Sequence, residues 1–268
     1  MPAGRSYEKR VRAKREAARA ARKHAERMRK VRIGASIGGS IAVVVVVLLL
    51  FLGGNDKKPV ATTTPLSGCT QPIPAPTPNG KQITTAPKMT IDQNKIYVAT
   101  IQTSCGSVKM TMDPKKAPAS VNNFVFLARQ NYFDGTKLPR VQNSPGFQII
   151  QAGTQTGTIS GGVGYTYAGE TPAPGTKYTR GTVAMANSRG PSTNGSQFFF
   201  VLSATTTALD QNANYSIFGK VDDATSLTTL DKILTAKGPR VDPQQELGIT
   251  PEPPIYILKV TIEELKRS

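Results

Sequence analysis

An uncharged apolar run, Ile33–Leu52, constrains this chain more than any other part of its sequence. Twenty helical residues rise about 30 Å, which matches the hydrocarbon thickness of a bilayer. A buried core helix is the alternative, but core helices rarely reach this length without a polar face. The run therefore predicts a single transmembrane helix at residues 33–52.

The segment before this run predicts its orientation. Residues 1–32 hold 13 Lys and Arg against three Glu, whereas the rest of the chain has only a small excess of basic residues. Because basic residues are retained in the cytoplasm, we expect the N-terminus inside and residues 53–268 outside the cell membrane. A cleaved signal peptide fits less well, because both segments are too long and no Ala-x-Ala follows Leu52.

The basic cytoplasmic tail, residues 1–32, has two candidate partners. A basic helix beside a membrane span most simply lies on anionic headgroups. Nucleic acid is the alternative, because the tail would neutralise several phosphates. Tyr7 is the only aromatic residue of the tail, and no recognisable reading motif is present. We therefore expect the membrane, and not nucleic acid, as its partner.

Residues 53–90 are predicted to be an extended Pro/Thr-rich linker. Their seven prolines stand among Thr, Gly, Asn and Lys, and such a stretch buries too little surface to offset its ordering entropy. Leu66–Cys69 resembles a lipoprotein cleavage box, but the apolar stretch that this box needs does not precede it. The folded domain is then residues 91–268, which is long enough for one sizeable core.

Hydrophobic periodicity in this domain predicts many short strands and two helices. Alternating residues at 96–103 and 108–112 predict a β-hairpin across Gly106, and helical spacing predicts helices at 117–130 and 224–236. Further strands are predicted at 147–151, 181–186, 197–202, 216–221 and 255–262. The pattern indicates a mainly β fold, a closed antiparallel β-barrel capped by two α-helices.

The scarcity of histidine and cysteine excludes several kinds of site. His24, in the basic tail, is the only histidine, and Cys69 and Cys105 are the only cysteines. Zinc sites built from several Cys and His, and Ser-His-Asp or Cys-His relays, are thus excluded from the domain. The glycine-rich stretch 153–164 lacks the Gly-Lys-Ser/Thr of a phosphate loop. We expect no metal or cofactor, and the sequence leaves open whether the two cysteines pair.

Four segments of the domain match one family signature in order: Tyr132–Thr136, Val183–Asn187, Asn194–Phe199 and Asn214–Val221. They resemble the cyclophilins, which are β-barrel peptidyl-prolyl cis-trans isomerases, and the resemblance extends over residues 95–265. With its anchor and linker, the chain resembles the membrane-tethered cyclophilins of Gram-positive actinobacteria.

Isomerisation of an X–Pro bond requires few catalytic groups in a site. Amide resonance sets a barrier of about 18–20 kcal/mol, and no nucleophile, metal or general base is needed to cross it. The site must bind the twisted bond better than the planar forms. A cation or donor aimed at the prolyl nitrogen achieves this, because that nitrogen gains a lone pair as resonance is lost. A domain without histidine is compatible with this reaction.

The resemblance implies that Arg140 is the catalytic residue. It stands where the family has an arginine in a Phe-His-Arg motif, with Leu138 and Pro139 in place of the Phe and His. An arginine on a solvated loop is the alternative. Gln151 matches the glutamine that positions the arginine and the substrate backbone, although its distance along the chain from Arg140 is longer than in most cyclophilins.

The resemblance also implies a pocket for the proline ring. Phe199 matches its floor and Phe147 another wall, and Gln148 makes that wall more polar. Ala208 stands where the family often has Trp, so we expect weak binding of cyclosporin-like ligands. The residues expected to bind substrate are Phe147, Gln148, Gln151, Ala186, Asn187, Gln197, Phe199, Leu209 and Tyr215.

The sequence therefore predicts a peptidyl-prolyl isomerase that acts on proline-containing polypeptides exported to, or attached to, the cell envelope and assists their folding. The alternative is a cyclophilin-fold binding module or chaperone with little catalytic activity. The changes at Leu138, Pro139, Gln148 and Ala208 favour this alternative.

Overall fold

A computed structural model describes residues 66–211, 213–242 and 245–267. The predicted tail at 1–32, the predicted transmembrane helix at 33–52 and the first part of the predicted linker lie outside these residues. Within the described ranges, no helix is long and apolar enough to cross a membrane. Residues Thr63–Ser268 form a compact unit, and the fold is that of the described part of this unit.

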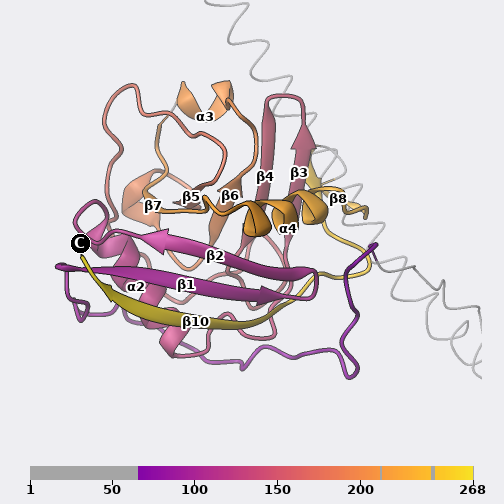
Figure 1. Cartoon of the computed structure of the whole chain (residues 1–268), viewed down its shortest axis with the longest axis horizontal. Helices are drawn as coiled ribbons and strands as arrows, with labels where there is room; N and C mark the ends of the chain where they lie inside the picture. Colours follow the sequence, from indigo (N-terminus) through magenta and orange to yellow (C-terminus); the bar gives the residue numbers. More distant parts are fainter. Residues whose placement is uncertain (1–65, 212, 243–244, 268) are drawn as a thin grey trace, which may run out of the picture. The chain divides into compact units, whose positions relative to one another are not determined.

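The unit is built mainly from one ten-stranded sheet (Figure 1). Its strands are β1 (Lys95–Thr103), β2 (Gly106–Met112), β3 (Arg140–Ser144), β4 (Phe147–Ala152), β5 (Thr182–Met185), β6 (Phe198–Val201), β7 (Ile217–Lys220), β8 (Arg240–Asp242), β9 (Gln245–Ile249) and β10 (Ile257–Lys266). Their order is β10-β1-β2-β7-β5-β6-β4-β3-β9-β8, and every neighbouring pair is antiparallel. The prediction of a mainly β, antiparallel fold is confirmed.

A short bridge links the two distant parts of this strand order. Lys137, just before β3, pairs with Tyr256, just before β10. Beside it, the backbone N–H of Leu138 donates to the carbonyl of Ile255 at 2.9 Å. The sheet therefore curls until the start of β10 meets the segment that leads into β3. Leu138 is buried at this junction.

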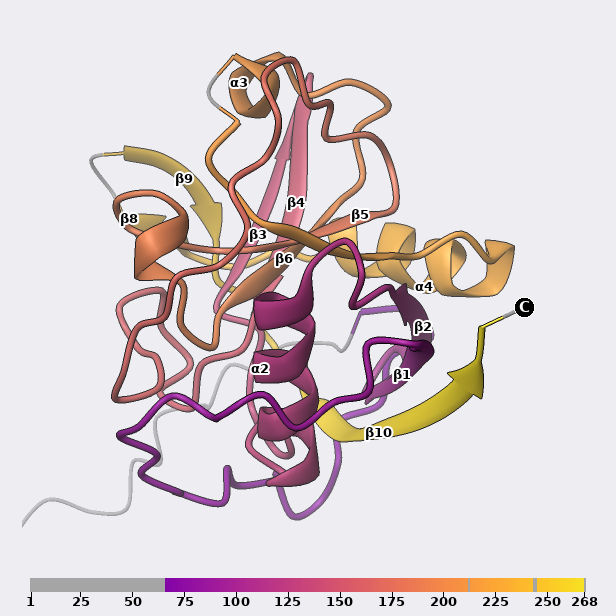
Figure 2. The same ribbon diagram turned by 90° about the vertical axis from the view of Figure 1, so that its left-hand side faces the viewer.

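Helical segments accompany the sheet (Figure 2): α2 (Pro118–Arg129), α3 (Thr207–Asp210), α4 (Ala224–Leu234) and the 3-10 turn η1 (Pro191–Thr193). Helix α2 lies against β10, and α4 lies against β2. Pro118 occupies the first turn of α2, where its missing N–H removes no helical bond. The two longer helices lie where the periodicity predicts them, whereas α3 is an element that the sequence did not predict.

Aromatic rings fill the space between α2 and the sheet. Phe124 of α2 stacks on Phe133 with ring centroids 5.0 Å apart and meets Phe198 of β6 edge-on at 5.3 Å. Phe198 and Phe200 belong to this main core, whereas Phe199 belongs to a second, smaller cluster. Consecutive strand residues face opposite sides of a sheet, so β6 separates the two clusters.

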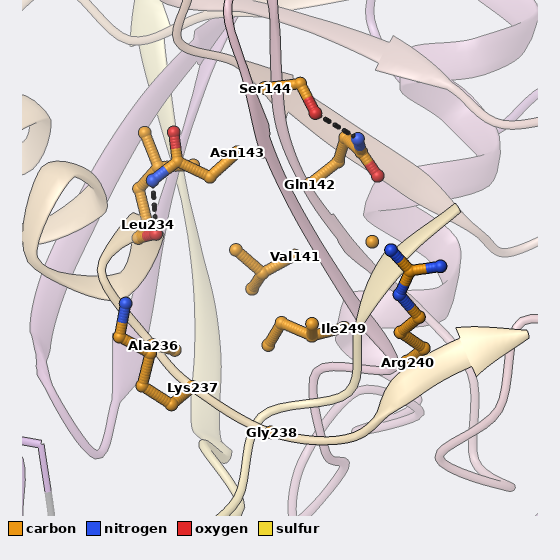
Figure 3. Close-up of a pocket in the computed structure, with 11 residues that line it drawn as sticks. Val141, Gln142, Asn143, Ser144, Leu234, Ala236, Lys237, Gly238, Arg240 and Ile249 are labelled. Carbon is orange, nitrogen blue, oxygen red and sulfur yellow. Dashed lines mark hydrogen bonds between the residues drawn. The ribbon is translucent and has the colours of Figure 1, made fainter. Parts of the chain in front are cut away.

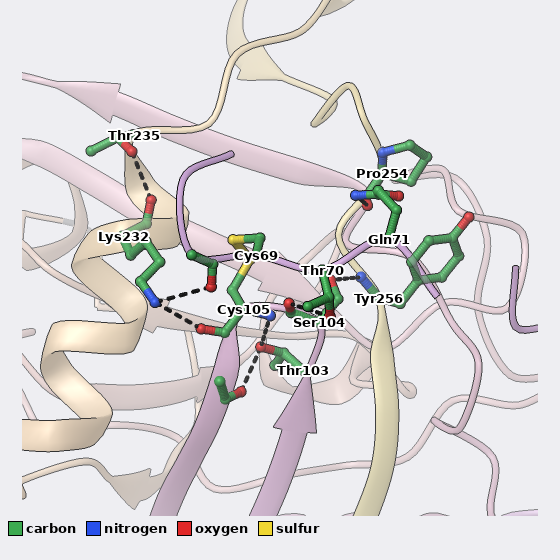
Figure 4. The surroundings of a disulfide bond; sticks show 12 residues. Cys69, Thr70, Gln71, Thr103, Ser104, Cys105, Lys232, Thr235, Pro254 and Tyr256 are labelled. Carbon is green, nitrogen blue, oxygen red and sulfur yellow. Dashed lines mark hydrogen bonds between the residues drawn. A yellow bond between two sulfur atoms is a disulfide. The ribbon is translucent and has the colours of Figure 1, made fainter. Parts of the chain in front are cut away.

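Residues 66–90 form a strap that runs along the domain. Figure 4 shows the disulfide between Cys69 of the strap and Cys105 of the β1–β2 turn, so the two cysteines pair. The Lys232 ammonium of α4 donates to the carbonyls of Gly68 at 3.3 Å and Cys105 at 3.1 Å. The start of the strap is thereby fixed to both β1–β2 and α4.

The later part of the strap is attached by hydrogen bonds. The Asn79 side-chain amide donates to the carbonyl of Asn131, just after α2, at 2.7 Å. The Ile83 carbonyl accepts from the N–H of Gly164 at 2.9 Å. Within residues 66–90, a segment predicted from composition to be a linker thus contacts the domain at several points. The remainder of the predicted linker, residues 53–65, lies outside the described residues.

Candidate functional site

A hollow of about 230 Å³ opens on the side of β6 that carries the smaller cluster. It is lined by Arg140, Phe147, Ile149, Gln151, Ile159, Ala186, Asn187, Phe199, Leu209, Tyr215 and Leu247. Eight of the ten residues predicted for the site are among them. The structure therefore brings together side chains that are spread over more than seventy positions of the sequence.

Strand register explains how the central residues meet. Arg140 of β3 is the register partner of Gln151 of β4, and Gln151 is the partner of Phe199 of β6. Phe199 is in turn the partner of Ala184 of β5. Directly opposed residues on neighbouring antiparallel strands share one face of the sheet. The arginine, the glutamine and the phenylalanine therefore form one row across three strands.

Side-chain amides extend this row. Nη1 of Arg140 donates to Oε1 of Gln151 at 3.3 Å, and Nε2 of Gln151 donates to Oε1 of Gln197 at 2.7 Å. Nε2 of Gln197 donates to the carbonyls of Ile159, at 3.0 Å, and Gly161 in the glycine-rich loop. These bonds form a relay from Arg140 through Gln151 and Gln197 to the glycine-rich loop. Because the oxygen and the nitrogen of each amide are both bonded, the relay fixes the orientation of both amides in the site.

Arg140 is a partly buried cation without a counter-ion. Burial lowers the pKa of its guanidinium below the ordinary value, but a guanidinium stays protonated at neutral pH. No Asp or Glu lines the hollow, and Arg140 makes no ion pair within the described residues. Its positive charge is therefore free to act on a ligand.

The opposite wall of the hollow is apolar. Phe199, buried at the floor, meets the ring of Tyr215 edge-on at 5.3 Å, and buried Leu209 belongs to the same cluster. The Tyr178 hydroxyl donates to the carbonyl of Tyr215 at 2.9 Å and accepts from its N–H at 3.0 Å. These two bonds fix the rim that carries Tyr215, so the pocket has a defined shape.

A second hollow of about 420 Å³ adjoins the first and shares Gln151, Ile159, Ala186 and Asn187 with it. Gln197, which does not line the first hollow, lines this one. The two together make a groove that runs from the apolar pocket past the amide relay to the glycine-rich loop.

Gln148 lies differently from the expectation, whereas Asn187 lines both hollows but uses its side chain within a turn. Gln148 does not line either hollow, and its Nε2 donates to Oδ1 of Asn143 at 2.8 Å. The side chain of Asn187 donates to the carbonyl of Asn214 at 2.8 Å and accepts from the N–H of Gly190 at 2.8 Å. The Asn187 side chain therefore stabilises a turn, and the backbone of Asn187 remains available to contact a ligand.

Three lining residues, Ile149, Ile159 and Leu247, were not predicted. Ile149 lies two positions before Gln151 on the same strand, so period-two alternation was a usable signal. Ile159 lies in the glycine-rich loop, and Leu247 lies in β9, whose sequence showed no clear strand pattern. No local motif marks either of them.

Figure 3 shows a third hollow, of about 390 Å³, between β3, the end of α4 and the β8–β9 hairpin. Val141 and Ile249 contribute apolar surface there, and Lys237 and Arg240 contribute cations. None of the predicted site residues lines it. Within the described part of the chain, no group of three or more His, Cys, Asp or Glu side chains is placed to hold a metal ion.

The comparisons with known proteins agree with this geometry. Residues 98–262 match the sequence profile described as "Cyclophilin type peptidyl-prolyl cis-trans isomerase/CLD". A relative named "Probable peptidyl-prolyl cis-trans isomerase B" in Mycobacterium tuberculosis (strain ATCC 25618 / H37Rv) is 36% identical over 160 residues, which cover 56% of this chain and 50% of the relative. A "Peptidyl-prolyl cis-trans isomerase" of Helicobacter pylori (strain ATCC 700392 / 26695) is 37% identical over 139 residues, which cover 52% of this chain and 81% of the relative. The chain thus spans about half the length of the mycobacterial relative.

Solved structures show the same likeness. A crystal structure of a cyclophilin-type peptidyl-prolyl cis-trans isomerase from Cryptosporidium parvum has a TM-score of 0.51 and 28% identity, and the match covers 63% of this chain and 98% of that one. A structure of the same protein in the presence of the dipeptide Ala-Pro has a TM-score of 0.50 and 30% identity, with 62% and 98% covered.

Proposed function

Because this chain belongs to the cyclophilin-type peptidyl-prolyl cis-trans isomerase family, we propose that its domain catalyses the cis–trans isomerisation of X–Pro bonds in polypeptides. The observation that carries the proposal is the placement of Arg140. It is a partly buried cation without an ion-pair partner among the described residues, and it lines the hollow of about 230 Å³ together with the apolar side chains of Phe199 and Leu209. The row Arg140, Gln151 and Phe199 places donor and pocket on one face of the sheet.

In the proposed mechanism the proline ring enters the pocket over Phe199. As the X–Pro bond twists, resonance is lost and the prolyl nitrogen gains a lone pair, towards which the Arg140 guanidinium donates. Gln151 and Gln197 hold the flanking peptide backbone through the hydrogen-bonding capacity that their own bonds leave, namely the second N–H of Gln151 and a further lone pair on each amide oxygen. The site accelerates the reaction because these contacts favour the twisted bond over both planar forms.

The proposed substrates are proline-containing polypeptides that are exported or belong to the cell envelope. The predicted anchor at 33–52 and the basic tail support this location. The Cys69–Cys105 disulfide supports it independently, since disulfides persist in oxidising compartments outside the cytoplasm. On this proposal the protein is a single-pass membrane protein whose domain assists the folding of such polypeptides.

A catalytically weak binding module or chaperone is the second candidate function. Ala208 favours it, because an aromatic wall that the family often has is missing there. The other changes carry less weight, since Leu138 is buried in the junction with β10 and Gln148 faces away from the hollow. Weak binding of cyclosporin-like ligands, which also follows from Ala208, stays a prediction.

NMR exchange spectroscopy on an Ala-Pro peptide tests the proposal. The full chain in detergent micelles is compared with Arg140→Ala and with Arg189→Ala, an exposed arginine whose side chain bonds to no other described residue. We expect the wild type and Arg189→Ala to accelerate exchange, and Arg140→Ala to lose about 100-fold, as for removal of one donor from a preorganised site. If the wild type binds the peptide without accelerating exchange, the domain is a binding module and the proposed activity is wrong.

A further inference from the structure

The β8–β9 hairpin contributes one residue to the hollow. This residue does not belong to the row formed by Arg140, Gln151 and Phe199. Leu247, in β9, lines the hollow together with Phe199. Its backbone carbonyl accepts a hydrogen bond from Nε of Arg140. One residue therefore touches both the pocket and the proposed catalytic arginine.

The hairpin is anchored on both sides of Arg140. The Thr250 hydroxyl donates to the carbonyl of Pro139 at 3.1 Å, and Ile249 pairs with Val141. Figure 2 shows β9 alongside β3 accordingly. Arg140 stands between these two anchor points, so the position of its backbone and the position of the Leu247 carbonyl are set by the same contacts.

Gly248 makes the close approach of the two strands possible. Its φ of +93° lies where side chains are rarely found, and a Cβ at this position would lie 2.4 Å from the carbonyl oxygen of Val141. Any larger residue must therefore move β9 away from β3. Such a movement withdraws the adjacent Leu247 carbonyl from Arg140.

We propose that Leu247 is a positioning residue for Arg140 and a specificity-determining residue of the proline pocket, an inference that rests on the proposed isomerase function. A guanidinium has five N–H donors in one plane. Leu247 engages Nε and Gln151 engages Nη1, so two contacts at different atoms fix the plane and leave the other donors for the substrate. The side chain of Leu247 closes the pocket beside the ring, where it limits the size of the residue that precedes proline.

The positioning role is tested with Gly248→Ala in the full chain. Gly175→Ala is the matched control, since Gly175 also has a positive φ, of +80°, but a Cβ there meets nothing within 4 Å. We expect Gly248→Ala to lower kcat/KM for an Ala-Pro peptide by about 10- to 100-fold, as for a small misplacement of a catalytic group, whereas Gly175→Ala keeps it. The NMR signal of the Arg140 Nε–H, assigned by its loss in Arg140→Lys, should shift and exchange faster with water in Gly248→Ala only.

The NMR signal separates the two hypotheses. If the wild type does not accelerate exchange, the proposed function fails, but the Nε–H signal still decides whether the carbonyl holds Arg140. An unchanged Nε–H signal in folded Gly248→Ala overturns the positioning role, and so does an unchanged kcat/KM in an active protein.

Leu247→Ala tests the specificity role and does not depend on whether Gly248→Ala folds. This variant keeps the backbone carbonyl that accepts from Arg140, so the Arg140 Nε–H signal should stay where it is in the wild type. We expect the ratio of kcat/KM for a Leu-Pro peptide to that for an Ala-Pro peptide to rise by about tenfold, as for a small change in an apolar pocket. An unchanged ratio overturns the role of the side chain.

Discussion

Arg140 carries the charge of the site in a form that does not titrate near neutral pH. Burial lowers the pKa of its guanidinium, but arginine starts so far above neutrality that it stays a cation. Among the described residues no Asp or Glu lines the hollow, and the only histidine of the sequence, His24, belongs to the basic tail. The proposed catalysis therefore depends on the placement of a permanent charge and not on a proton transfer.

We expect kcat/KM for an Ala-Pro peptide to be flat between about pH 6 and pH 8.5, because no group that would change charge in this range lines the site. The measurement is NMR exchange of the peptide across this range at constant ionic strength. A bell-shaped profile, or a step near pH 6.5, would show that a titrating group takes part in the reaction.

The sequence predicted those residues of the site for which the proposed reaction requires a particular kind of side chain. Arg140, Gln151 and Phe199 stand in motifs, and strand register brings them into one row. Gln148 was placed in a wall because it stands where the family commonly has an apolar Met, but it follows Phe147 directly, and consecutive strand residues face opposite sides of a sheet. Leu247 was not predictable in this way, because its contact with Arg140 is made by a backbone carbonyl, which no side-chain pattern reveals.

At the scale of elements, the N-terminus of α2 is completed by a residue from a distant loop. The residue at its N-cap, Ala117, has no side-chain acceptor. The Glu170 carboxylate takes that place and accepts from the backbone N–H of Ala119 at 2.7 Å and from the hydroxyl of Ser120 at 2.6 Å. A negative charge at this end of a helix is also favoured by the helix dipole. Glu170 thereby connects the long loop after β4 to the helix.

We expect Glu170→Ala to lower the free energy of unfolding by about 1–2 kcal/mol, the usual cost of losing a cap. Glu170→Gln keeps one amide oxygen as an acceptor and should cost less. Urea unfolding followed by circular dichroism measures both. Glu263→Ala is the control, since the exposed Glu263 carboxylate bonds to no side chain in the described part of the chain. Equal stabilities of Glu170→Ala and Glu263→Ala would show that the cap contributes nothing.

Elements with a strong pattern were predictable and elements without one were not. α2 and α4 bury one apolar face each, and the predicted ranges exceed the observed ones by only one or two residues at an end. β3 has a single apolar residue, Val141, so it shows no alternation, although it carries Arg140. β8 and β9 are short, β9 pairs with β3 at one position only and β8 pairs with β9, so neither strand carries a long alternating pattern of its own.

At the scale of the whole unit, the strap shows where composition is misleading. Residues 66–90 have few large apolar groups, which predicts a free linker, yet Cys69 is buried and bonded to Cys105. The strap also touches the glycine-rich loop of the site, since the Ile83 carbonyl accepts from the Gly164 N–H at 2.9 Å. Covalent and backbone bonds of this kind do not appear in composition. They attach the strap to the domain without a large apolar contact.

We therefore expect the disulfide to be the main attachment of the strap. It joins residues separated by 36 positions, and closing a loop of this length is expected to stabilise the fold by about 2–4 kcal/mol, chiefly by restricting the unfolded chain. Urea unfolding with and without reductant measures the difference, and the Cys69→Ser/Cys105→Ser variant should match the reduced wild type and show no further response to reductant. Hydrogen exchange at residues 66–90 locates the effect: it should be slow in the oxidised protein and fast in the variant. Equally fast exchange in both forms would mean that the strap behaves as the free linker that its composition predicts, and that the disulfide attaches only one end of it.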